Sequence, residues 1–275
     1  MTRAPGTHRR SRETVIADEL VHFVVDGGVA TITLDSPQNR NALSRRLVAE
    51  LAERVERALG DPTVRVVLLT GAGPVFCSGA DLKEQRAANA GGNTAASPTG
   101  VGGVAEILLR IWNAPKPFVC RVNGAARAGG LGLVAACDIS VGVETASFAF
   151  SEVRIGVAPA IISVVTLPRL GVVKGMELML TGEPFSAAEA VSYGLLNACA
   201  PAEGLDAAVG GYIEKLLKGG PKALAATKAL VREVPGMAVA AAFEAMARRS
   251  AELFASSEAL EGMSAFAERR DPRWV

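Results

Sequence analysis

Residues 64–82 read VRVVLLTGAGPVFCSGADL and indicate the fold class of this chain. The run from Val64 to Thr70 is largely apolar and β-branched, and it ends in the turn residues Gly71-Ala72-Gly73-Pro74, as a buried strand does. The same arrangement recurs where the apolar run Phe118–Val122 ends in Asn123-Gly124. A strand, a glycine loop and a helix that repeat in this order predict an α/β core.

The segments before this stretch add a hairpin and a helix to the prediction. Val21–Val25 and Val29–Leu34 are β-branched runs separated by Asp26-Gly27-Gly28, which predicts a hairpin with its turn. A helix is expected from Ser44, because apolar residues then recur at every fourth position, and Gly60-Asp61-Pro62 would end it. The apolar positions of this helix are Leu47, Leu51, Val55 and Leu59.

The order of the segments predicts three parts of the chain. Residues 1–15 are expected to form a disordered basic tail, residues 16–200 an α/β core, and residues 201–275 a C-terminal helical region. Within the core, the stretch Asn89–Gly103 is rich in Gly, Ser and Thr and lacks periodicity, so it is interpreted as a mobile loop where a substrate lid could lie. Helical spacing beyond Ser186 covers residues 187–193, 205–217, 222–234 and 238–254.

Composition limits the possible functions. A chain of 275 residues with 49% hydrophobic content can bury the core of one large domain. A formal net charge of +1 gives no global field for nucleic acid or an anionic membrane, so neither partner is expected. Four widely spaced cysteines and two histidines argue against a metal site or a disulfide framework and favour the reducing cytoplasm. No apolar run reaches the roughly 18–20 residues that span a bilayer.

Two glycine loops, Phe76–Leu82 and Asn123–Gly132, are the candidates for chemistry, and each stands between an expected strand and an expected helix. Backbone N–H groups at a helix start have no partner in their own helix and can point at a ligand. Neither loop is a P-loop, since no Gly-Lys-Ser/Thr follows, and the second lacks the G-x-G-x-x-G spacing of dinucleotide sites. Each loop alone is a weak signal that turn glycines or close helix packing explain better than a ligand site does.

Together with Phe148–Gly156, which reads FAFSEVRIG, the two loops resemble the enoyl-CoA hydratase/isomerase (crotonase) family in order, spacing and residue type. The resemblance implies a crotonase-like (ClpP/crotonase) spiral of β-β-α units with a C-terminal helical trimerisation region, and assembly as a homotrimer or homohexamer. It implies an acyl-CoA thioester as substrate, with no metal and no cofactor other than the coenzyme A of that substrate. The other matching segments are Asn41-Ala42-Leu43, Lys116-Pro117, Cys137-Asp138-Ile139, Leu167-Pro168-Arg169-Leu170 and residues 266–272.

The resemblance also implies roles for individual residues. The backbone N–H groups of Ala80 and Gly129 would hold the thioester carbonyl oxygen as it gains enolate charge, and Glu152 would act as general acid and base. A carboxylate among apolar neighbours has a raised pKa, which suits proton transfer near neutral pH. Arg40, Lys83 or Lys116 could hold phosphates. Contacts to the substrate or to coenzyme A are expected at Asn41, Ala42, Ser78, Gly79, Asp81, Leu82, Lys83, Gly130 and Gly132.

One position departs from the family pattern, because the second carboxylate of typical hydratases would stand at Gly132. A hydratase (a lyase) could still work if the proton of the attacking water passes to Glu152. A Δ3-Δ2-enoyl-CoA isomerase using Glu152 alone and a non-catalytic acyl-CoA-binding protein are the alternatives. Similarity of residues 129–139 and 151–160 to bacterial methylglutaconyl-CoA hydratases favours the hydratase.

Four further side chains have open roles at this point. Asp81 and Glu84 are possible second acids, but a cap or brace is the preferred reading for Asp81, and Glu84 lies one turn along an expected helix with Lys83 beside it. Trp112 and Phe185 either line an acyl pocket or belong to the core.

Overall fold

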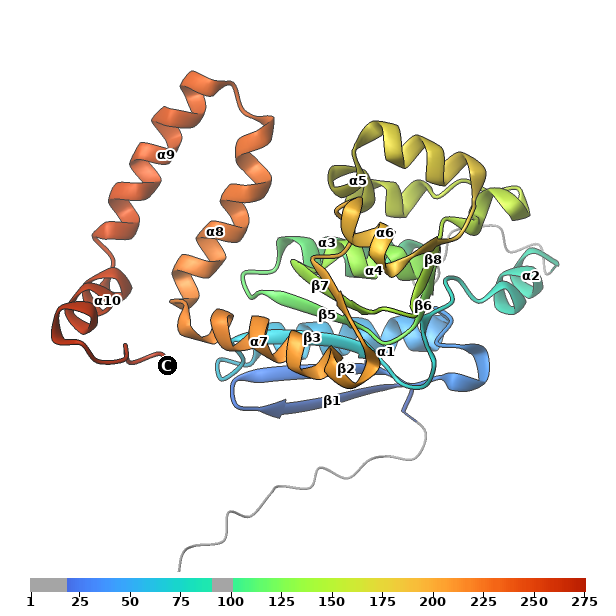
Figure 1. Ribbon diagram of the computed structural model, residues 1–275, viewed down its shortest axis with the longest axis horizontal. Helices are drawn as coiled ribbons and strands as arrows, with labels where there is room; N and C mark the ends of the chain where they lie inside the picture. The colour runs from blue at the N-terminus through green and yellow to red at the C-terminus, as the bar shows by residue number, and fades with distance from the viewer. Residues whose placement is uncertain (1–18, 91–100) are drawn as a thin grey trace, which may run out of the picture.

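Two β-sheets form the centre of the molecule, and the computed structural model describes residues 19–90 and 101–275 (Figure 1). The larger sheet has the order β1-β2-β3-β5-β7-β10 and the smaller one the order β4-β6-β8-β9. In the larger sheet β1 and β2 are antiparallel, and the other neighbours are parallel. Its strands are Val21–Asp26 (β1), Val29–Leu34 (β2), Val66–Gly71 (β3), Phe118–Val122 (β5), Ile139–Val143 (β7) and Ala198–Ala200 (β10).

Successive units of the chain each give one strand to each sheet. β3 is followed by β4, β5 by β6 and β7 by β8, and each pair then leads into a helix. The predicted spiral of β-β-α units is therefore confirmed. The smaller sheet consists of Val75–Cys77 (β4), Ala125–Arg127 (β6), Ser147–Ala149 (β8) and Phe185–Ser186 (β9), and the helices of the core are Arg45–Gly60 (α1), Leu82–Ala90 (α2), Val101–Asn113 (α3), Gly129–Ala136 (α4), Ala160–Thr181 (α5), Ala187–Ser192 (α6) and Leu205–Lys218 (α7).

The local predictions near the N-terminus are confirmed. Gly27 and Gly28 join β1 to β2 with φ angles of 54° and 80°, a conformation that glycine adopts without strain. Ser44 caps α1, because its side chain accepts a hydrogen bond from the Leu47 N–H at 3.3 Å. The apolar stripe of α1 is buried against the larger sheet, with Leu47 and Leu51 fully inaccessible.

The loop predicted over Asn89–Gly103 is wrong at both ends. α2 continues through Ala90, and α3 begins at Val101. The glycines at 102 and 103 lower helix propensity, but burial of Ile107, Leu108 and Ile111 stabilises α3 by more than that loss. Residues 91–100, and the predicted tail over residues 1–15, lie outside the described residues.

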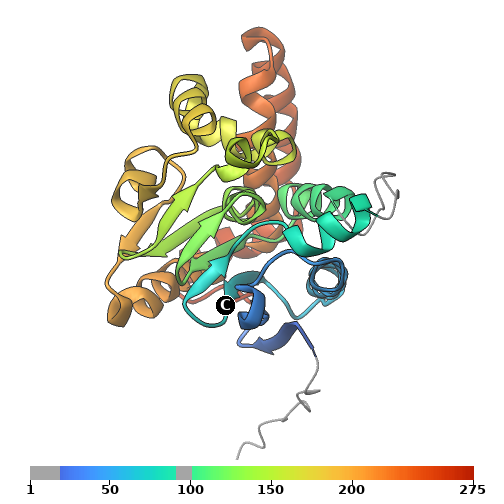
Figure 2. The same ribbon diagram turned by 90° about the vertical axis from the view of Figure 1, so that its right-hand side faces the viewer.

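Beyond α7 the chain forms a C-terminal arm, which we define as residues 221–268: α8 (Pro221–Glu233), α9 (Val239–Phe254) and α10 (Ser257–Glu268). α7 lies against β5 and β7, whereas α8 and α9 extend away from the sheets as an antiparallel pair (Figures 1 and 2). In α9 only Ala242 is buried among the described side chains. No helix of the described residues is long and apolar enough to cross a membrane.

A largely buried ion-pair network around Asp138 holds the arm to the core. Asp138 accepts hydrogen bonds from Lys228 Nζ and Arg232 Nη2, both at 2.8 Å, and from the Phe118 N–H at 2.8 Å. The side chains of Lys228 and Asp138 are only 9% and 19% exposed. Burial lowers the pKa of Lys228, and the charge of Asp138 opposes this shift. Asp138 thus fixes α8 against the amino end of β5.

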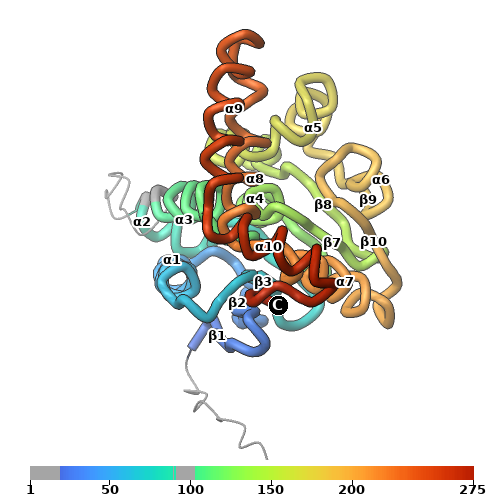
Figure 3. Tube along the Cα trace, turned by 90° about the vertical axis from the view of Figure 1, so that its left-hand side faces the viewer, coloured from blue at the N-terminus to red at the C-terminus, as the bar shows by residue number. Residues whose placement is uncertain are grey.

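A second contact returns the end of the chain to the larger sheet. The Arg65 guanidinium donates to the carbonyl oxygens of Trp274 and Gly219, and the Trp274 indole N–H donates to the Lys218 carbonyl oxygen at 3.1 Å. Figure 3 shows the C-terminus beside α7 and α10. The chain is therefore attached to the core both before and after the arm.

Candidate active site

Three neighbouring strands of the smaller sheet end at the same edge, and the candidate groups follow them directly. β4, β6 and β8 are parallel and adjacent. Ala80 comes three residues after β4, Gly129 two residues after β6 and Glu152 three residues after β8. Because the carboxyl ends of parallel strands meet at one edge, the sheet brings Ala80 and Glu152 to either side of Gly129. The Ala128 N–H donates to the Ala149 carbonyl oxygen at 3.2 Å and connects the second glycine loop to the end of β8.

The first glycine loop contacts Leu43 through its backbone and approaches the second glycine loop closely. The Leu43 N–H donates to the Gly79 carbonyl oxygen at 2.8 Å, and Leu43 and Ala80 form a parallel bridge. A Cβ atom added to Gly129 would lie 2.7 Å from Leu43 Cδ1, and one added to Gly79 would lie 2.8 Å from Ala128 Cβ. Glycine at both positions therefore permits an approach that a side chain would block.

Two backbone donors at this edge are available to a ligand. Gly129 is the first residue of α4, so its N–H has no acceptor within the helix. The hydrogen bonds of the described residues include none from the Ala80 N–H. The start of α4 also carries the positive end of the helix dipole, which favours an oxygen that gains negative charge. The arrangement can stabilise an oxyanion.

Ala128, which directs the Gly129 amide, has a strained backbone. Its φ and ψ angles are 47° and −118°, a region that residues with a Cβ atom rarely adopt. Such a conformation costs about 1–3 kcal/mol and persists where surrounding contacts impose it. The ψ angle of Ala128 sets the direction of the Gly129 N–H, so the strained residue is the one that orients this donor. The sequence gives no sign of it, because alanine is ordinary in a loop.

Glu152 holds one carboxylate oxygen away from solvent. It lies in a short 3-10 helix, Ser151–Ile155 (η2), directly after Phe150, which is fully buried. Glu152 Oε2 is inaccessible to solvent and has no hydrogen-bond partner among the described residues. Burial raises the pKa of Glu152, although a hydrogen bond with its own backbone opposes the shift. An acid with one unpaired oxygen and a raised pKa is suited to transferring protons near neutral pH.

Gly132 lies one turn beyond Gly129 in α4, and the space beside it is already filled. A Cβ atom at this position would lie 2.7 Å from Ile162 Cγ2 and 3.0 Å from Leu108 Cδ1. Ile162 and Leu108 are 4% and 3% exposed. Both residues were missed by the sequence analysis, because no pattern in one sequence links positions 24 and 30 residues away from Gly132.

The Asn41 side chain faces the interior of the protein. It accepts a hydrogen bond from the Ser36 N–H at 2.7 Å and donates to the carbonyl oxygens of Ala72 and Val75 at 3.0 and 2.8 Å. Asn41 is fully buried, and Ala42 beside it is 5% exposed. The Asn41 side chain thus braces the loops, and its N–H donates to the Ser36 carbonyl oxygen at 2.9 Å, so the ligand contact expected at Asn41 stays a prediction.

The two other acids near the first loop cap helices. Asp81 Oδ1 accepts hydrogen bonds from the N–H groups of Lys83 and Glu84 at 3.0 and 3.2 Å, at the start of α2. Glu84 Oε2 accepts from the Arg45 N–H at 2.9 Å, at the start of α1. Both carboxylates are therefore held by backbone donors, which supports the capping interpretation over a role as second acid. Lys83 and Leu82 lie on the surface beside them.

The structure also shows where Lys116, Phe185 and Trp112 lie relative to the glycine loops. Lys116 donates to the carbonyl oxygens of Ala58 and Asp61 at 2.8 and 2.6 Å, at the amino end of β5, so it caps α1 and does not reach the glycine loops. Phe185 is 4% exposed and stacks on Phe148 with ring centroids 5.6 Å apart, as a core residue does. The Arg232 Cζ atom, in α8, lies 4.1 Å from the centroid of the Trp112 ring, so Trp112 packs against the arm.

Comparison with known proteins gives the family context of this geometry. The family model described as "Enoyl-CoA hydratase/isomerase" matches residues 25–275. A putative enoyl-CoA hydratase of Thermus thermophilus is 35% identical over 91% of this chain and 99% of its own length. Carnitinyl-CoA dehydratase of Escherichia coli K12 is 35% identical over 93% of this chain and 98% of its own length. The crystal structure of an enoyl-CoA hydratase from Shewanella pealeana superposes with a TM-score of 0.88, at 30% identity over 93% of this chain and 96% of that chain.

Proposed function

Because the chain belongs to the enoyl-CoA hydratase/isomerase family, we propose that it adds water across the 2,3 double bond of an enoyl-CoA thioester. The observation that carries this proposal is the buried, unpaired carboxylate oxygen of Glu152 at the sheet edge that also presents the Ala80 and Gly129 N–H groups. The names of the relatives, hydratase and dehydratase, denote the two directions of this reaction.

In the proposed mechanism, the thioester carbonyl oxygen lies between the N–H groups of Ala80 and Gly129. Water adds to the β carbon, its proton passes to Glu152, and the carbonyl oxygen takes up the charge as an enolate. Glu152 then gives a proton to the α carbon, which regenerates its carboxylate and completes the addition. Each fixed donor contributes about 3 kcal/mol to the transition state, since the donors need no reorganisation.

The binding of coenzyme A is proposed at the surface beside the first loop. The residues proposed for these contacts surround the loop contacts described above: Ala42, Ser78, Gly79, Leu82 and Gly130. Arg40 and Lys83 are exposed there and are proposed to bind phosphate groups. The reaction needs no cofactor beyond the coenzyme A of the substrate. A reducing cytoplasm suits the four free cysteines, three of which are buried.

A Δ3-Δ2-enoyl-CoA isomerase is the second candidate, and Gly132 is the observation that favours it. With no carboxylate at this position, Glu152 could move a proton between C4 and C2 without water. Steady-state assays with crotonyl-CoA and with a 3-enoyl-CoA separate the two, because hydration removes the ultraviolet absorbance of the conjugated thioester and isomerisation creates it. We expect absorbance to fall with crotonyl-CoA. A rise with the 3-enoyl substrate alone would assign the isomerase, and no change with either would favour a non-catalytic acyl-CoA-binding protein.

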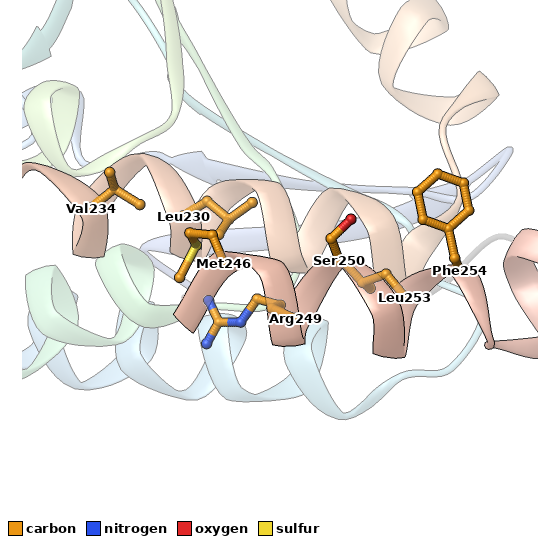
Figure 4. Close-up of a pocket in the computed structure, with 7 residues that line it drawn as sticks. All are labelled: Leu230, Val234, Met246, Arg249, Ser250, Leu253 and Phe254. Carbon is orange, nitrogen blue, oxygen red and sulfur yellow. The ribbon is translucent and has the colours of Figure 1, made fainter. Parts of the chain in front are cut away.

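We also propose that the C-terminal arm joins copies of this chain into a homotrimer or a homohexamer. A 16-residue helix such as α9 is marginal in water when one side chain is buried. Phe243, Phe254 and Phe266 are 76%, 66% and 89% exposed. Between α8 and α9 lies an apolar groove of about 360 Å³, which Figure 4 shows with Leu230, Val234, Met246, Arg249, Ser250, Leu253 and Phe254 around it. A surface of this kind is typical of an interface.

Light scattering is expected to give a mass of three or six times 28.4 kDa for the natural chain. Phe243→Asp should shift the mass toward the monomer, because it places a charge in the apolar contact. Val24→Asp, a matched change of an exposed apolar residue on β1, should leave the mass unchanged. A natural chain that is monomeric at all protein concentrations would contradict the proposal.

A further inference from the structure

Gly132, in the first turn of α4, is covered by side chains of α3 and α5. Gly132 is three residues beyond Gly129, so both lie on the same side of the helix. The atoms nearest to a Cβ added at Gly132 are Ile162 Cγ2 at 2.7 Å, Leu108 Cδ1 at 3.0 Å and Ile162 Cβ at 3.3 Å. Distances under 3.0 Å leave no room for a side chain at position 132 unless Ile162 moves.

Ile162 reaches this position because of where α5 begins. The chain leaves β8, passes through Glu152 in η2, and enters α5 at Ala160. The turn between them is held by the Val157 N–H, which donates to the Glu152 carbonyl oxygen at 3.2 Å. Ile162 is thus in the first turn of α5 and packs on the helix that starts with Gly129. The Ile162 side chain is hydrocarbon and 4% exposed, so it brings no polar group to this wall.

We propose that Ile162, backed by Leu108, is the residue that limits this site to one acid. The Ile162 side chain occupies the volume that an acid on the first turn of α4 would require, and so leaves the proton transfers to Glu152. The acyl group then meets a hydrocarbon wall on the α4 side and one carboxylate on the η2 side. This inference rests on the proposed hydratase function and adds the residue that decides how many acids the site can hold.

Four purified proteins test the role of Ile162: the natural chain, Gly132→Glu, Ile162→Ala, and the double variant with both changes. Gly132→Glu alone is expected to lower the melting temperature by about 5 °C, because it overfills the contact with Ile162 and Leu108. The double variant is expected to recover most of that loss, because Ile162→Ala removes the closest atom. It should also hydrate crotonyl-CoA at least about tenfold faster than Ile162→Ala, since a second acid then has room to act.

Ile161→Ala is the matched control, because Ile161 precedes Ile162 in α5 and is not among the atoms nearest to position 132. Combined with Gly132→Glu, it should rescue neither melting temperature nor turnover. Gly132→Ala should lower the melting temperature without adding charge, and Ile162→Ala should remove this loss. Equal rescue by Ile161→Ala would overturn the assignment to Ile162.

The melting temperatures need no turnover, so the two proposals can fail separately. If the changes in melting temperature are not additive and none of the four proteins hydrates crotonyl-CoA, the hydratase function is overturned, whereas the contact between positions 132 and 162 is supported. Hydration by the natural chain together with additive melting temperatures would overturn the role of Ile162. A gain in hydration by Gly132→Glu alone, with no loss of melting temperature, would overturn it as well.

Discussion

Turnover is expected to fall by a factor of about 10² to 10⁴ when Glu152 is replaced by glutamine. The amide has the size of the carboxylate but cannot take the proton from water or give one to the α carbon. Binding should be retained within a few fold, because the donors for the thioester oxygen are the Ala80 and Gly129 backbones, which the substitution does not touch. Initial rates with crotonyl-CoA and calorimetric titration with a saturated acyl-CoA would measure the two effects.

Glu177→Gln is a suitable control for this experiment. Glu177 lies on the surface in α5 and pairs with Lys174 at 2.6 Å, so its loss should leave kcat unchanged. Glu152→Gln should not unfold the protein, because the carboxylate oxygen that it replaces has no partner to lose. Retention of full activity by a folded Glu152→Gln variant would remove Glu152 from the mechanism.

Replacement of Asp138 by alanine is expected to lower the free energy of unfolding by about 3–5 kcal/mol. The substitution would leave Lys228 and Arg232 without their carboxylate and the Phe118 N–H without its acceptor. Burial already lowers the pKa of Lys228, and Asp138 is the main group that opposes the shift, so this pKa should fall further. Urea unfolding at a fixed protein concentration would measure the loss.

Two further variants serve as controls for the loss in free energy of unfolding. Asp206→Ala removes a partner of Arg121 whose side chain is 81% exposed, and it should cost less than about 1 kcal/mol. Asp138→Asn keeps the shape and an oxygen for the Phe118 N–H but loses the charge, so its stability should lie between those of the natural chain and Asp138→Ala. Equal losses for Asp138→Ala and Asp206→Ala would show that the Asp138 network does not stabilise the attachment of the arm.

The elements that could be predicted are those that short stretches of chain determine. The hairpin follows from the glycines at 27 and 28, and α1 follows from its cap at Ser44 and its apolar stripe. The family resemblance supplied the β-β-α spiral, which the arrangement of β3 to β8 confirms. The roles of Glu152 and the two amide donors stay proposals, although the sheet gathers them at one edge.

The parts that could not be predicted depend on contacts between distant segments. α3 forms over a stretch whose glycines favour a loop, because its apolar residues are buried by the core. Lys116 and Asp81 have the charges of ligand-binding residues, but backbone groups of α1 and α2 engage them. The contact of Ile162 with Gly132 joins two helices, and helical periodicity says which face of a helix is buried but not which residue it meets.

The close contact between positions 132 and 162 also limits how this sequence can change by evolution. A larger residue that arose first at position 132 would overfill the contact, and a smaller residue that arose first at position 162 would leave a void. Either single step costs about 1–3 kcal/mol, a large share of the roughly 5–15 kcal/mol that holds a typical domain folded. The effect of each substitution thus depends on the residue at the other position, which is epistasis. Descendants of this chain should keep or lose the pair together.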